Sequence, residues 1–314
     1  MPAKTGKWQD ERAAYERVMR DYTIPSLLET FRLLRAKYPQ YVFHSDVFSI
    51  DMTAVPLNLV KQHFRPEHKL DALLKTTRRD PLQEKLVKLV NFLSEKSGIP
   101  TSSFGVTGSI LLGIHNPKFS DIDLTIYGQR NSQKLKETIN ALVANFASPL
   151  KRLQGALLED WCRKKTQRYP LTLKDAKRII ERKWNIGVFE GTLFSVHPAK
   201  VESEMAEKYG DKSYRPEGEV TIEATVINDG ESMFLPCVYK VNNVKIIEGK
   251  QTSTEIEEVV SYESLYDSLA ETGEKILVKG KLEHVTDYRK GRKYYRVLVG
   301  SPEGKGEEYV KFAK

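Results

Sequence analysis

A short alternation of polar and apolar residues marks one stretch of the chain as a strand that carries acids on one face. In Asp-Ile-Asp-Leu-Thr-Ile, residues 121–126, the polar positions share one side of a strand and the apolar positions share the other. The apolar side can pack on a core, so Asp121 and Asp123 project from the open side about 7 Å apart. Two fixed carboxylates at this spacing can hold a hard cation such as Mg²⁺, which bridges the phosphates of a nucleotide. The pattern therefore predicts a site for a metal ion and a nucleotide on this strand.

A strongly helical pattern precedes this strand, over residues 80–98. Its apolar residues recur with helical spacing, so one face must be buried, and Asp80 and Gly98 suit the two caps. A short strand at 103–107, a Gly-Ser turn and a second capped helix from Asn131 follow. The resulting order of helix, strand, turn, helix, acidic strand and helix predicts a small α/β core.

From residue 219 onward the period of the apolar pattern changes to two. Residues 220–227 alternate cleanly, and four more short strands with one short helix, near 260–270, are expected before residue 300. Five or so short strands with one helix favour a small closed β-barrel, for which the oligonucleotide-binding barrel is the commonest candidate. The predicted fold class is therefore α+β, with a small mixed sheet flanked by helices and a C-terminal barrel.

Three domains follow from these changes of pattern. A polar, turn-rich joint at 209–218 separates the first two thirds of the chain from the β region. The expected domains are a helical N-terminal extension that docks as a layer, at 1–79, a core at 80–214 with a basic helical insertion at 151–185, and a barrel-like domain at 215–314.

The positive charge of the chain is concentrated outside its C-terminal third. The 314 residues carry a net charge of +8, yet residues 215–314 hold 15 Lys and Arg against 18 Asp and Glu. Residues 151–185 hold 11 Lys and Arg against 4 Asp and Glu, with few acids between the cations, which favours a surface that faces a polyanion over a merely solvated face. The cations that crowd its second helix are Lys174, Lys177, Arg178, Arg182 and Lys183.

A second candidate for nucleic-acid binding is the expected hairpin at 288–296. It interleaves aromatic and basic residues, among them Arg292, Lys293 and Tyr294, and this combination can stack bases and neutralise phosphates. The surrounding domain has a net negative charge, so an exposed tip whose cations serve solubility is an equally open alternative.

The remaining composition excludes several classes of protein. The two cysteines, Cys162 and Cys237, lack metal-ligand spacing, which argues against a zinc module or a disulfide framework. No apolar run approaches the roughly 20 residues needed to cross a bilayer, and the first residues lack the pattern of a secretory signal. We therefore expect a cytoplasmic protein with no membrane partner.

The acidic strand belongs to a longer motif with a family resemblance. Gly108-Ser109, eleven residues, then Asp121-Ile122-Asp123 resembles the signature of the polymerase β-type nucleotidyltransferase superfamily. A glycine at this turn lets backbone amides approach a triphosphate, and the Ser109 hydroxyl can donate to a terminal phosphate. The resemblance implies that Asp121 and Asp123 hold two Mg²⁺ ions, with Mn²⁺ as a substitute, and that an NTP is the substrate. Arg182 and Lys183 are the candidates for neutralising the departing pyrophosphate.

The wider chain, from Val42 to its end, looks like a family of predicted archaeal nucleotidyltransferases with an appended β domain. The segments that carry this resemblance include 41–65, 102–128, 182–185, 191–195 and Pro236-Cys237. The superfamily pattern has a third carboxylate on a later strand, and the most similar position here is Ser195. Glu190 lies nearby with the opposite strand parity, and Glu223 on the next predicted strand is another candidate for the missing acid.

The sequence thus favours a Mg²⁺-dependent nucleotidyltransferase that moves a nucleoside monophosphate from an NTP to a hydroxyl acceptor. RNA is the favoured acceptor because of the basic span and the predicted barrel. Two alternatives stay open. A small molecule or a protein could be the acceptor, and the chain could be a nucleic-acid-binding protein that keeps the fold with weak or no catalysis.

Overall fold

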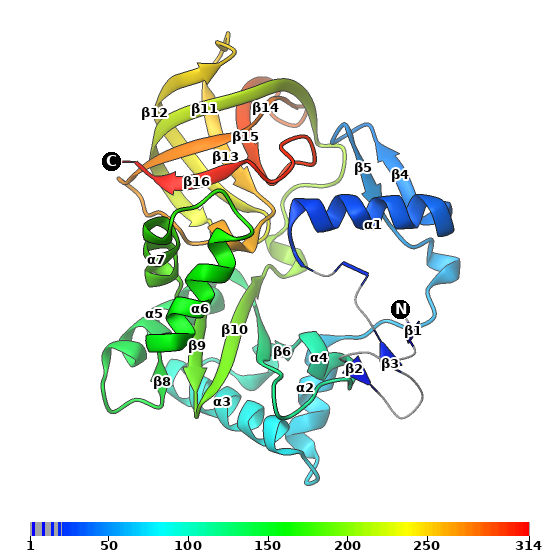
Figure 1. Cartoon of the computed structure of the whole chain (residues 1–314), viewed down its shortest axis with the longest axis vertical. Helices are drawn as coiled ribbons and strands as arrows, with labels where there is room; N and C mark the ends of the chain where they lie inside the picture. The colour runs from blue at the N-terminus through cyan, green and yellow to red at the C-terminus, as the bar shows by residue number, and fades with distance from the viewer. Residues whose placement is uncertain (1, 4–7, 10–13, 16–17, 20, 314) are drawn as a thin grey trace. The chain divides into compact units, whose positions relative to one another are not determined.

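The computed structural model divides into two compact units, each built from separate stretches of sequence. The core unit comprises Met1–Val18, Lys61–Leu158 and Trp184–Met205, and the β unit comprises Met19–Val60, Glu159–Lys183 and Ala206–Lys314. Figure 1 labels their helices and strands. The residues that the structure describes are 2–3, 8–9, 14–15, 18–19 and 21–313.

The core unit contains a five-stranded mixed sheet. Its strands lie in the order β6-β7-β10-β9-β8, in which β7 and β10 run parallel and the other neighbours run antiparallel. Strand β7 lies between β6 and β10, so the strand that carries Asp123 has a hydrogen-bonded neighbour on each side. The bounds are β6 (Phe104–Val106), β7 (Ile122–Tyr127), β8 (Leu150–Lys151), β9 (Ile186–Phe189) and β10 (Thr192–Ala199).

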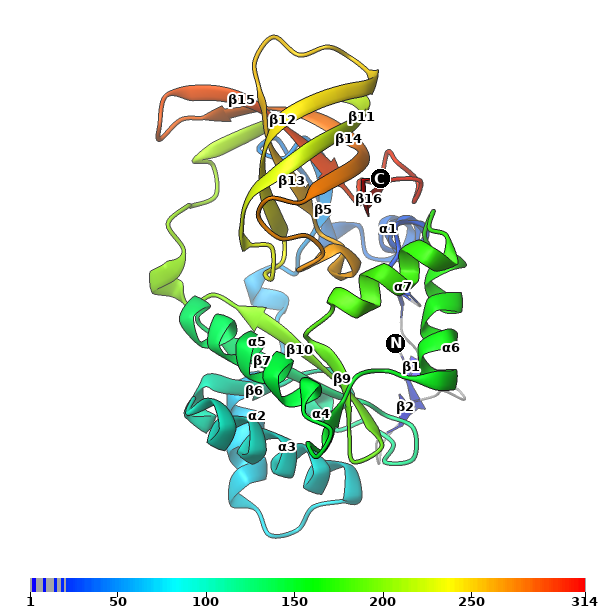
Figure 2. The same ribbon diagram turned by 90° about the vertical axis from the view of Figure 1, so that its left-hand side faces the viewer.

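Helices α3 and α5 pack against each other and share the apolar core of this sheet, as Figures 1 and 2 show. The predicted caps of α3 are confirmed, because the Asp80 side chain accepts from two backbone N–H groups and Gly98 ends the helix in the left-handed region. Ile122, Leu124 and Ile126 of β7 are completely buried in the same core, so the predicted apolar face is confirmed. The helices of this unit are α2 (Pro66–Lys75), α3 (Pro81–Ser97), α4 (Gly108–Leu112) and α5 (Gln129–Ala144), with the 3-10 turns η3 (Thr101–Ser103) and η4 (Glu202–Glu204).

Helix α5 begins two residues before the expected Asn131. Its N-cap residue is Gly128, which makes no side-chain cap, and the Glu204 carboxylate instead accepts from the N–H of Gln129 at 2.9 and 3.0 Å. Asn131 donates to the carbonyl of Tyr127 at 2.9 Å. A cap supplied from 75 residues away cannot be read from local sequence, which explains the displaced start.

The β unit contains a six-stranded sheet whose pairings close on themselves. The order is β11-β12-β13-β15-β14-β16, and β11 also pairs with β14. Strands β13 and β15 run parallel, and every other pairing is antiparallel. The short helix expected near 260–270 is only the 3-10 turn η5 (Ser264–Tyr266). The strands are β11 (Lys212–Glu231), β12 (Cys237–Gly249), β13 (Ile256–Ser261), β14 (Lys275–Asp287), β15 (Arg292–Val299) and β16 (Tyr309–Phe312).

The basic insertion belongs partly to the β unit rather than wholly to the core. Helices α6 (Gly155–Thr166) and α7 (Leu173–Arg182) match the two predicted helices, and the predicted capping pair of Thr172 and Asp175 is confirmed. Residues 159–183 group with the C-terminal strands because Leu171 and Ile179 are buried in the apolar core of that unit. The unit boundaries therefore differ from the expected ones at 79/80 and 214/215.

The N-terminal region is only partly helical. The described parts of 1–79 include helix α1 (Ile24–Lys37), and also three short strands, β1 (Pro2–Ala3), β2 (Trp8–Gln9) and β3 (Ala14–Tyr15), in the order β1-β3-β2. A hairpin of β4 (Val42–Ser45) and β5 (Ile50–Thr53) lies between the 3-10 turns η1 (Pro39–Tyr41) and η2 (Leu57–Leu59). The helical prediction for residues 1, 4–7, 10–13, 16–17 and 20 falls outside the described residues.

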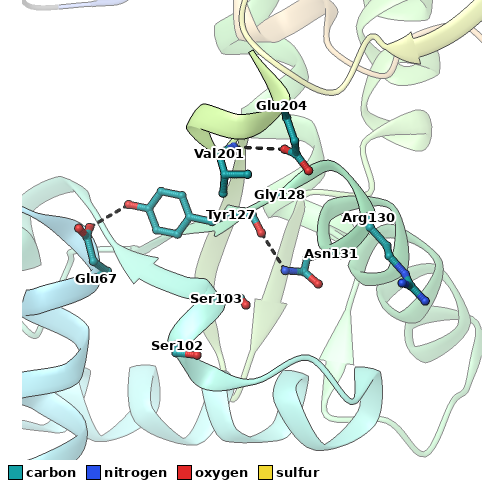
Figure 3. A pocket seen from close by; sticks show the side chains of 9 residues that line it. All are labelled: Glu67, Ser102, Ser103, Tyr127, Gly128, Arg130, Asn131, Val201 and Glu204. Carbon is teal, nitrogen blue, oxygen red and sulfur yellow. Dashed lines mark hydrogen bonds between the residues drawn. The ribbon is translucent and has the colours of Figure 1, made fainter. Parts of the chain in front are cut away.

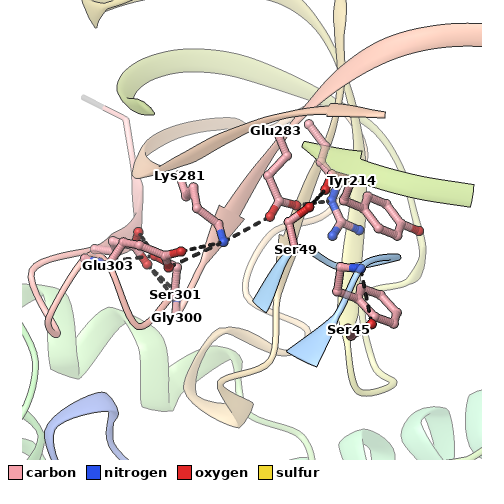
Figure 4. Close-up of polar contacts among 12 residues, drawn as sticks. Ser45, Ser49, Tyr214, Lys281, Glu283, Gly300, Ser301 and Glu303 are labelled. Carbon is pink, nitrogen blue, oxygen red and sulfur yellow. Dashed lines mark hydrogen bonds and ion pairs between the residues drawn. The ribbon is translucent and has the colours of Figure 1, made fainter. Parts of the chain in front are cut away.

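One face of the β unit holds a buried network of charged side chains, drawn in Figure 4. Glu283 accepts from the Nε of Arg296 at 2.7 Å and lies 3.1 Å from the Nζ of Lys281. These three side chains are at most 6% exposed. The Arg296 guanidinium lies 3.6 Å from the centroid of the Tyr214 ring, and the carbonyl of Tyr214 accepts from the hydroxyl of Ser49. Each buried charge here thus has an opposite charge beside it.

The described residues include no helix with the combination of length and apolar character that spanning a membrane requires.

Candidate functional site

The acidic face of β7 meets two polar residues of the parallel strand β10. The register places Ser195 beside Asp123 and His197 beside Thr125. The Ser195 hydroxyl donates to Oδ1 of Asp123 at 2.6 Å and lies 2.9 Å from Nε2 of His197. The side chains of Asp123, Ser195 and His197 therefore form one chain of hydrogen bonds along the sheet.

The turn that starts α4 lies directly against the carboxylate of Asp123. Gly108 has a φ of 62°, and a Cβ atom at this residue would lie only 2.2 Å from Oδ2 of Asp123. The N–H of Thr107 donates to the carbonyl of Asp123 at 2.8 Å, which fixes the turn to β7. Any side chain at position 108 would displace the acid, so glycine is required both by the backbone conformation and by the close approach.

The other two residues of the motif lie at the edges of this arrangement. Ser109 follows Gly108 in α4 and is 8% exposed; among the residues that the structure describes, its hydroxyl makes no hydrogen bond. Asp121 is exposed and immediately precedes β7. The structure thus brings Gly108, Ser109 and Asp123 together on adjacent elements, with Asp121 at the strand entrance.

Comparison with known proteins identifies this arrangement. A model of the nucleotidyltransferase domain matches residues 86–208, the span that contains Gly108, Asp123 and Ser195. The chain is also 32% identical over 284 residues to MJ1086 of Methanocaldococcus jannaschii, which is described as an uncharacterized protein, and the match covers 90% of this chain and 80% of that protein. The chain belongs to the nucleotidyltransferase-domain family. No solved structure matches the chain significantly.

The carboxylates of Asp121 and Asp123 suit a metal ion that takes its other ligands from water or from a phosphate. Among the described residues there is no group of three or more His, Cys, Asp or Glu side chains that could enclose an ion. Mg²⁺ usually binds through one or two carboxylates and takes its remaining ligands from water and substrate phosphates. Asp121 and Asp123 match that donor set, whereas a dedicated protein cage does not exist in the described part of the chain.

The structure does not place Glu190 beside the two aspartates. Glu190 lies in the turn between β9 and β10 with a φ of 46°, and its carboxylate is 3.5 Å from Nζ of Lys88. Ser195, the partner of Asp123, follows five residues later, which is about 16 Å along an extended strand. Glu223 is a residue of β11 in the β unit and pairs with Lys275 at 3.6 Å. Glu190 is therefore not beside Asp123, Glu223 has a lysine partner in its own unit, and the residue of β10 that pairs with Asp123 is Ser195.

The residues expected to bind pyrophosphate, Arg182 and Lys183, are paired within the β unit. The Arg182 guanidinium lies 2.5 Å from Glu274. The Lys183 ammonium is buried, lies 2.8 Å from Oδ1 of Asp267 and donates to the carbonyl of Ser264 at 2.6 Å. Their acidic partners follow more than 80 residues later, so local sequence gave no sign of them. These pairings give both cations a structural role in place of the predicted contact with pyrophosphate.

The other cations of α7 remain on the surface. Lys174, Lys177 and Arg178 are exposed, whereas Ala176 and Ile179 on the opposite side of the helix are buried. The guanidinium of Arg178 lies 4.2 Å from the centroid of the Phe312 ring. The ring packs against the Arg178 guanidinium and orients this side chain, but it does not neutralise the charge.

Of the three residues of the hairpin at 288–296 that were expected to bind nucleic acid, one is exposed, one is paired and one is buried. The Arg292 guanidinium binds both carboxylate oxygens of Glu257, at 2.7 and 2.9 Å, and Lys293 is exposed. Tyr294 is 1% exposed, and burial together with the nearby Glu258 raises the pKa of its hydroxyl. A buried ring cannot stack on a base, so the predicted role of Tyr294 in nucleic-acid binding is wrong. Tyr288, at the tip and 64% exposed, is the accessible aromatic residue.

A pocket of about 540 Å³ that sequence reasoning missed lies where β7 ends and α5 begins (Figure 3). The Tyr127 hydroxyl donates to Glu67 at 3.1 Å, and burial, with the help of that carboxylate, raises the pKa of Tyr127 to about 12. Tyr127 has the same strand parity as Asp123. This alternation was the one sign in the sequence that its side chain lies on the same face of the sheet as Asp123. The lining residues are Glu67, Ser102, Ser103, Tyr127, Gly128, Arg130, Asn131, Val201 and Glu204.

Proposed function

We propose that this nucleotidyltransferase moves a nucleoside monophosphate from an NTP to a hydroxyl acceptor, with Mg²⁺ or Mn²⁺ bound at Asp121 and Asp123. The observation that carries the proposal is the approach of Gly108 to the Asp123 carboxylate, where a single added Cβ would lie 2.2 Å from Oδ2. This approach joins a backbone turn suited to phosphates to an acid suited to a cation.

Each residue of the motif has a chemical task in this proposal. The turn at Gly108 admits the triphosphate, and the Ser109 hydroxyl donates a hydrogen bond to it. Asp121 and Asp123 would hold the cation and in this way orient the nucleotide. When bound, that cation supplies neutralisation of the charge that develops on the phosphates during transfer.

Two features of the β unit support RNA as the acceptor. The ring of pairings through β11, β12, β13, β15 and β14, with its single parallel pair, supports a five-stranded closed barrel of the oligonucleotide-binding type. Lys174, Lys177 and Arg178 add an exposed basic surface on α7 of the same unit. A barrel of this type with a neighbouring basic helix suits a single-stranded polyanion.

Transfer of label tests the proposal directly. The protein is incubated with total RNA, Mg²⁺ or Mn²⁺, and each NTP labelled at its α-phosphate. We expect labelled RNA from the wild type and none from the Asp121→Ala/Asp123→Ala double variant. Glu95→Ala, which removes an exposed acid of α3, is the matched control and should transfer normally. A wild type that labels no acceptor with either metal contradicts the enzymatic proposal.

A nucleic-acid-binding protein without turnover is the second candidate. It is favoured by Ser195, a neutral residue at the position where the superfamily pattern has an acid. This candidate predicts RNA binding that is unaffected by the Asp121→Ala/Asp123→Ala change and no transfer by any variant. Labelling of a small molecule or protein in a cell extract, with RNA unlabelled, would keep the chemistry and replace the acceptor.

A further inference from the structure

The pocket at the end of β7, drawn in Figure 3, has no task in the transfer chemistry proposed above. It lies beyond the last residues of β7 and β10, the parallel pair of the sheet, and open α/β sheets commonly bind ligands outside the carboxyl ends of such strands. We propose that this pocket binds one nucleoside of the acceptor RNA, a short way along the strand from the hydroxyl that attacks at Asp123. This inference rests on the proposed nucleotidyl transfer and concerns where its acceptor is held.

The two carboxylates of the pocket already have partners inside the protein. The Arg65 guanidinium lies 2.7 Å from Glu67, which also accepts from the Tyr127 hydroxyl at 3.1 Å. Both oxygens of Glu204 accept from the N–H of Gln129, at 2.9 and 3.0 Å, so this carboxylate occupies the positive end of helix α5. A lone cation is therefore not strongly attracted, and the helix end that would hold a phosphate is taken. A neutral ligand fits these surroundings best.

Three polar side chains of the pocket remain available to such a ligand. Among the described residues, the hydroxyls of Ser102 and Ser103 make no hydrogen bond. The side chain of Asn131 uses only its amide nitrogen, which donates to the carbonyl of Tyr127. The ring of Tyr127 and the half-buried Val201 add apolar surface. A base with polar edges on a ribose carries both kinds of surface, and about 540 Å³ is in the range of sites for molecules of this class.

The ring of Tyr127 is the surface on which the base would stack. Its hydroxyl donates to Glu67, and burial together with that carboxylate raises the pKa of Tyr127 to about 12, so the hydroxyl keeps its proton and this hydrogen bond. The bond holds the ring at one position. Stacking on an aromatic ring is open to every base, because each has a π face. The pocket would therefore hold a strand without selecting its sequence.

The separation between the pocket and Asp123 favours an extended ligand. Tyr127 follows Asp123 by four residues, which is about 13 Å along the strand, and its side chain leaves β7 on the same face. The exposed imidazole of His197 lies between them, on β10 beside Thr125. A ligand that fills the pocket and also presents a hydroxyl at Asp123 must cover this distance. A strand of RNA can do so, with a further base stacked on His197, whereas a small acceptor confined to the pocket cannot.

Cross-linking locates the RNA without relying on catalysis. Total RNA that contains thiouridine is irradiated with the protein, and the cross-linked peptides are identified by mass spectrometry. We expect cross-links within residues 102–103 or 127–131 of the wild type. Ser102→Trp places a ring in the pocket from an exposed position, so these cross-links should be lost in this variant.

Transfer kinetics separate a role in binding from a role in the fold. In Ser102→Trp the KM for RNA should rise about 10- to 100-fold, the range expected when the stacking of one base is lost. The KM for NTP and the rate at saturating RNA should stay those of the wild type. Ala147→Trp is the matched control, because it adds the same ring to an exposed residue beyond the opposite end of α5, and it should change none of these values.

The outcomes distinguish this inference from the proposed function. Cross-links confined to other parts of the chain, or an unchanged KM for RNA in a Ser102→Trp protein with the wild-type unfolding temperature, would overturn the inference while leaving nucleotidyl transfer intact. Label transferred to a protein or a small molecule in place of RNA would do the same. Cross-links in the pocket of a wild type that transfers no label would overturn the enzyme and keep the pocket as an RNA site. Absence of both transfer and cross-links would overturn both.

Discussion

Carboxylates in the two units of this molecule differ in their partners. In the β unit, Glu283 is enclosed by Arg296 at 2.7 Å and Lys281 at 3.1 Å. In the core unit, Asp123 interacts with a serine hydroxyl and a glycine turn, and no ion pair joins it to a cation among the described residues. A carboxylate that already has its cations stabilises a fold, whereas one that lacks them can bind an external cation. Glu283 and Asp123 thus differ in their partners rather than in the chemistry of their carboxylates, and only Asp123 has the surroundings of the proposed cation site.

The largest effect should come from breaking the buried network. Glu283→Gln leaves Arg296 buried without its carboxylate, and removing one partner of a buried pair typically costs about 3 to 5 kcal/mol of unfolding free energy. Urea unfolding measures this loss. Glu303→Gln is the control, because Glu303 is 52% exposed and lies 3.4 Å from the same Lys281. An exposed pair of this kind should contribute less than about 1 kcal/mol, and equal costs for the two variants would refute the distinction.

Two glycine substitutions test whether the close approach of Gly108 to Asp123 matters for transfer. Gly108→Ala and Gly113→Ala both place a side chain in the left-handed region, which costs about 1 to 2 kcal/mol of stability. At Gly113 nothing lies within 4 Å of the added Cβ, whereas at Gly108 the Asp123 carboxylate is in the way. Transfer should therefore fall in Gly108→Ala and persist in Gly113→Ala at similar stability. Equal activities of the two proteins would show that the approach to Asp123 is unimportant.

The same contrast between paired and exposed charges applies to the cations of α7. Changing Lys174, Lys177 and Arg178 to Gln should weaken RNA binding and reduce the slope of log affinity against log salt by about 2, since each phosphate contact to a single strand contributes about 0.7. Arg182→Gln removes a cation that Glu274 already binds, and it should leave the slope unchanged. Filter binding over a range of salt concentrations measures both. An unchanged slope in the triple variant would make α7 a solvated face.

The smallest effect should appear as a pH dependence at the start of α3. Burial raises the pKa of Asp80, but hydrogen bonds from the N–H of Gln83 and from His115, with the N–H of Leu82, outweigh it and hold the pKa below its usual value. The ionised form is thus favoured by folding. Its contribution to stability is present above the unfolded pKa of about 3.9 and is lost as the pH falls through the lower folded value. Asp80→Asn keeps the cap and should flatten the decline of unfolding free energy below pH 4; an unaltered decline would assign it to other acids.

Local patterns in the sequence predicted the elements that depend on neighbouring residues. The alternation of residues in β7 predicted which of its faces is buried. Asp80 and Gly98 predicted the two ends of α3, and Thr172 predicted the start of α7. The spacing of Gly108 and Asp123 also identified the motif of the site. Each of these features is fixed by contacts within a few residues, or by a motif whose spacing is visible in the chain.

Features that depend on distant residues were not predictable. The partners of Arg182 and Lys183 are Glu274 and Asp267, and nothing in a basic helix announces an acid so far along the chain. The residues around Tyr294 are those of an exposed hairpin, yet the ring of Tyr294 is buried in the sheet. Alternation assigns a side chain to a face of a strand, but it does not tell which other segment covers that face.

The way the chain is divided between the units has a consequence for how it folds during synthesis. The described segments of the core unit all precede residue 206, so its sheet can close while later residues are still being made. The β unit combines 19–60 and 159–183 with strands that extend to Phe312, and in its parallel pair the residues of β13 meet residues of β15 that follow 38 or 39 positions later. Pairings so distant along the chain form slowly. Until β15 and β16 emerge, the apolar side of α7 lacks part of its core, and a nascent chain should need protection from aggregation during that interval.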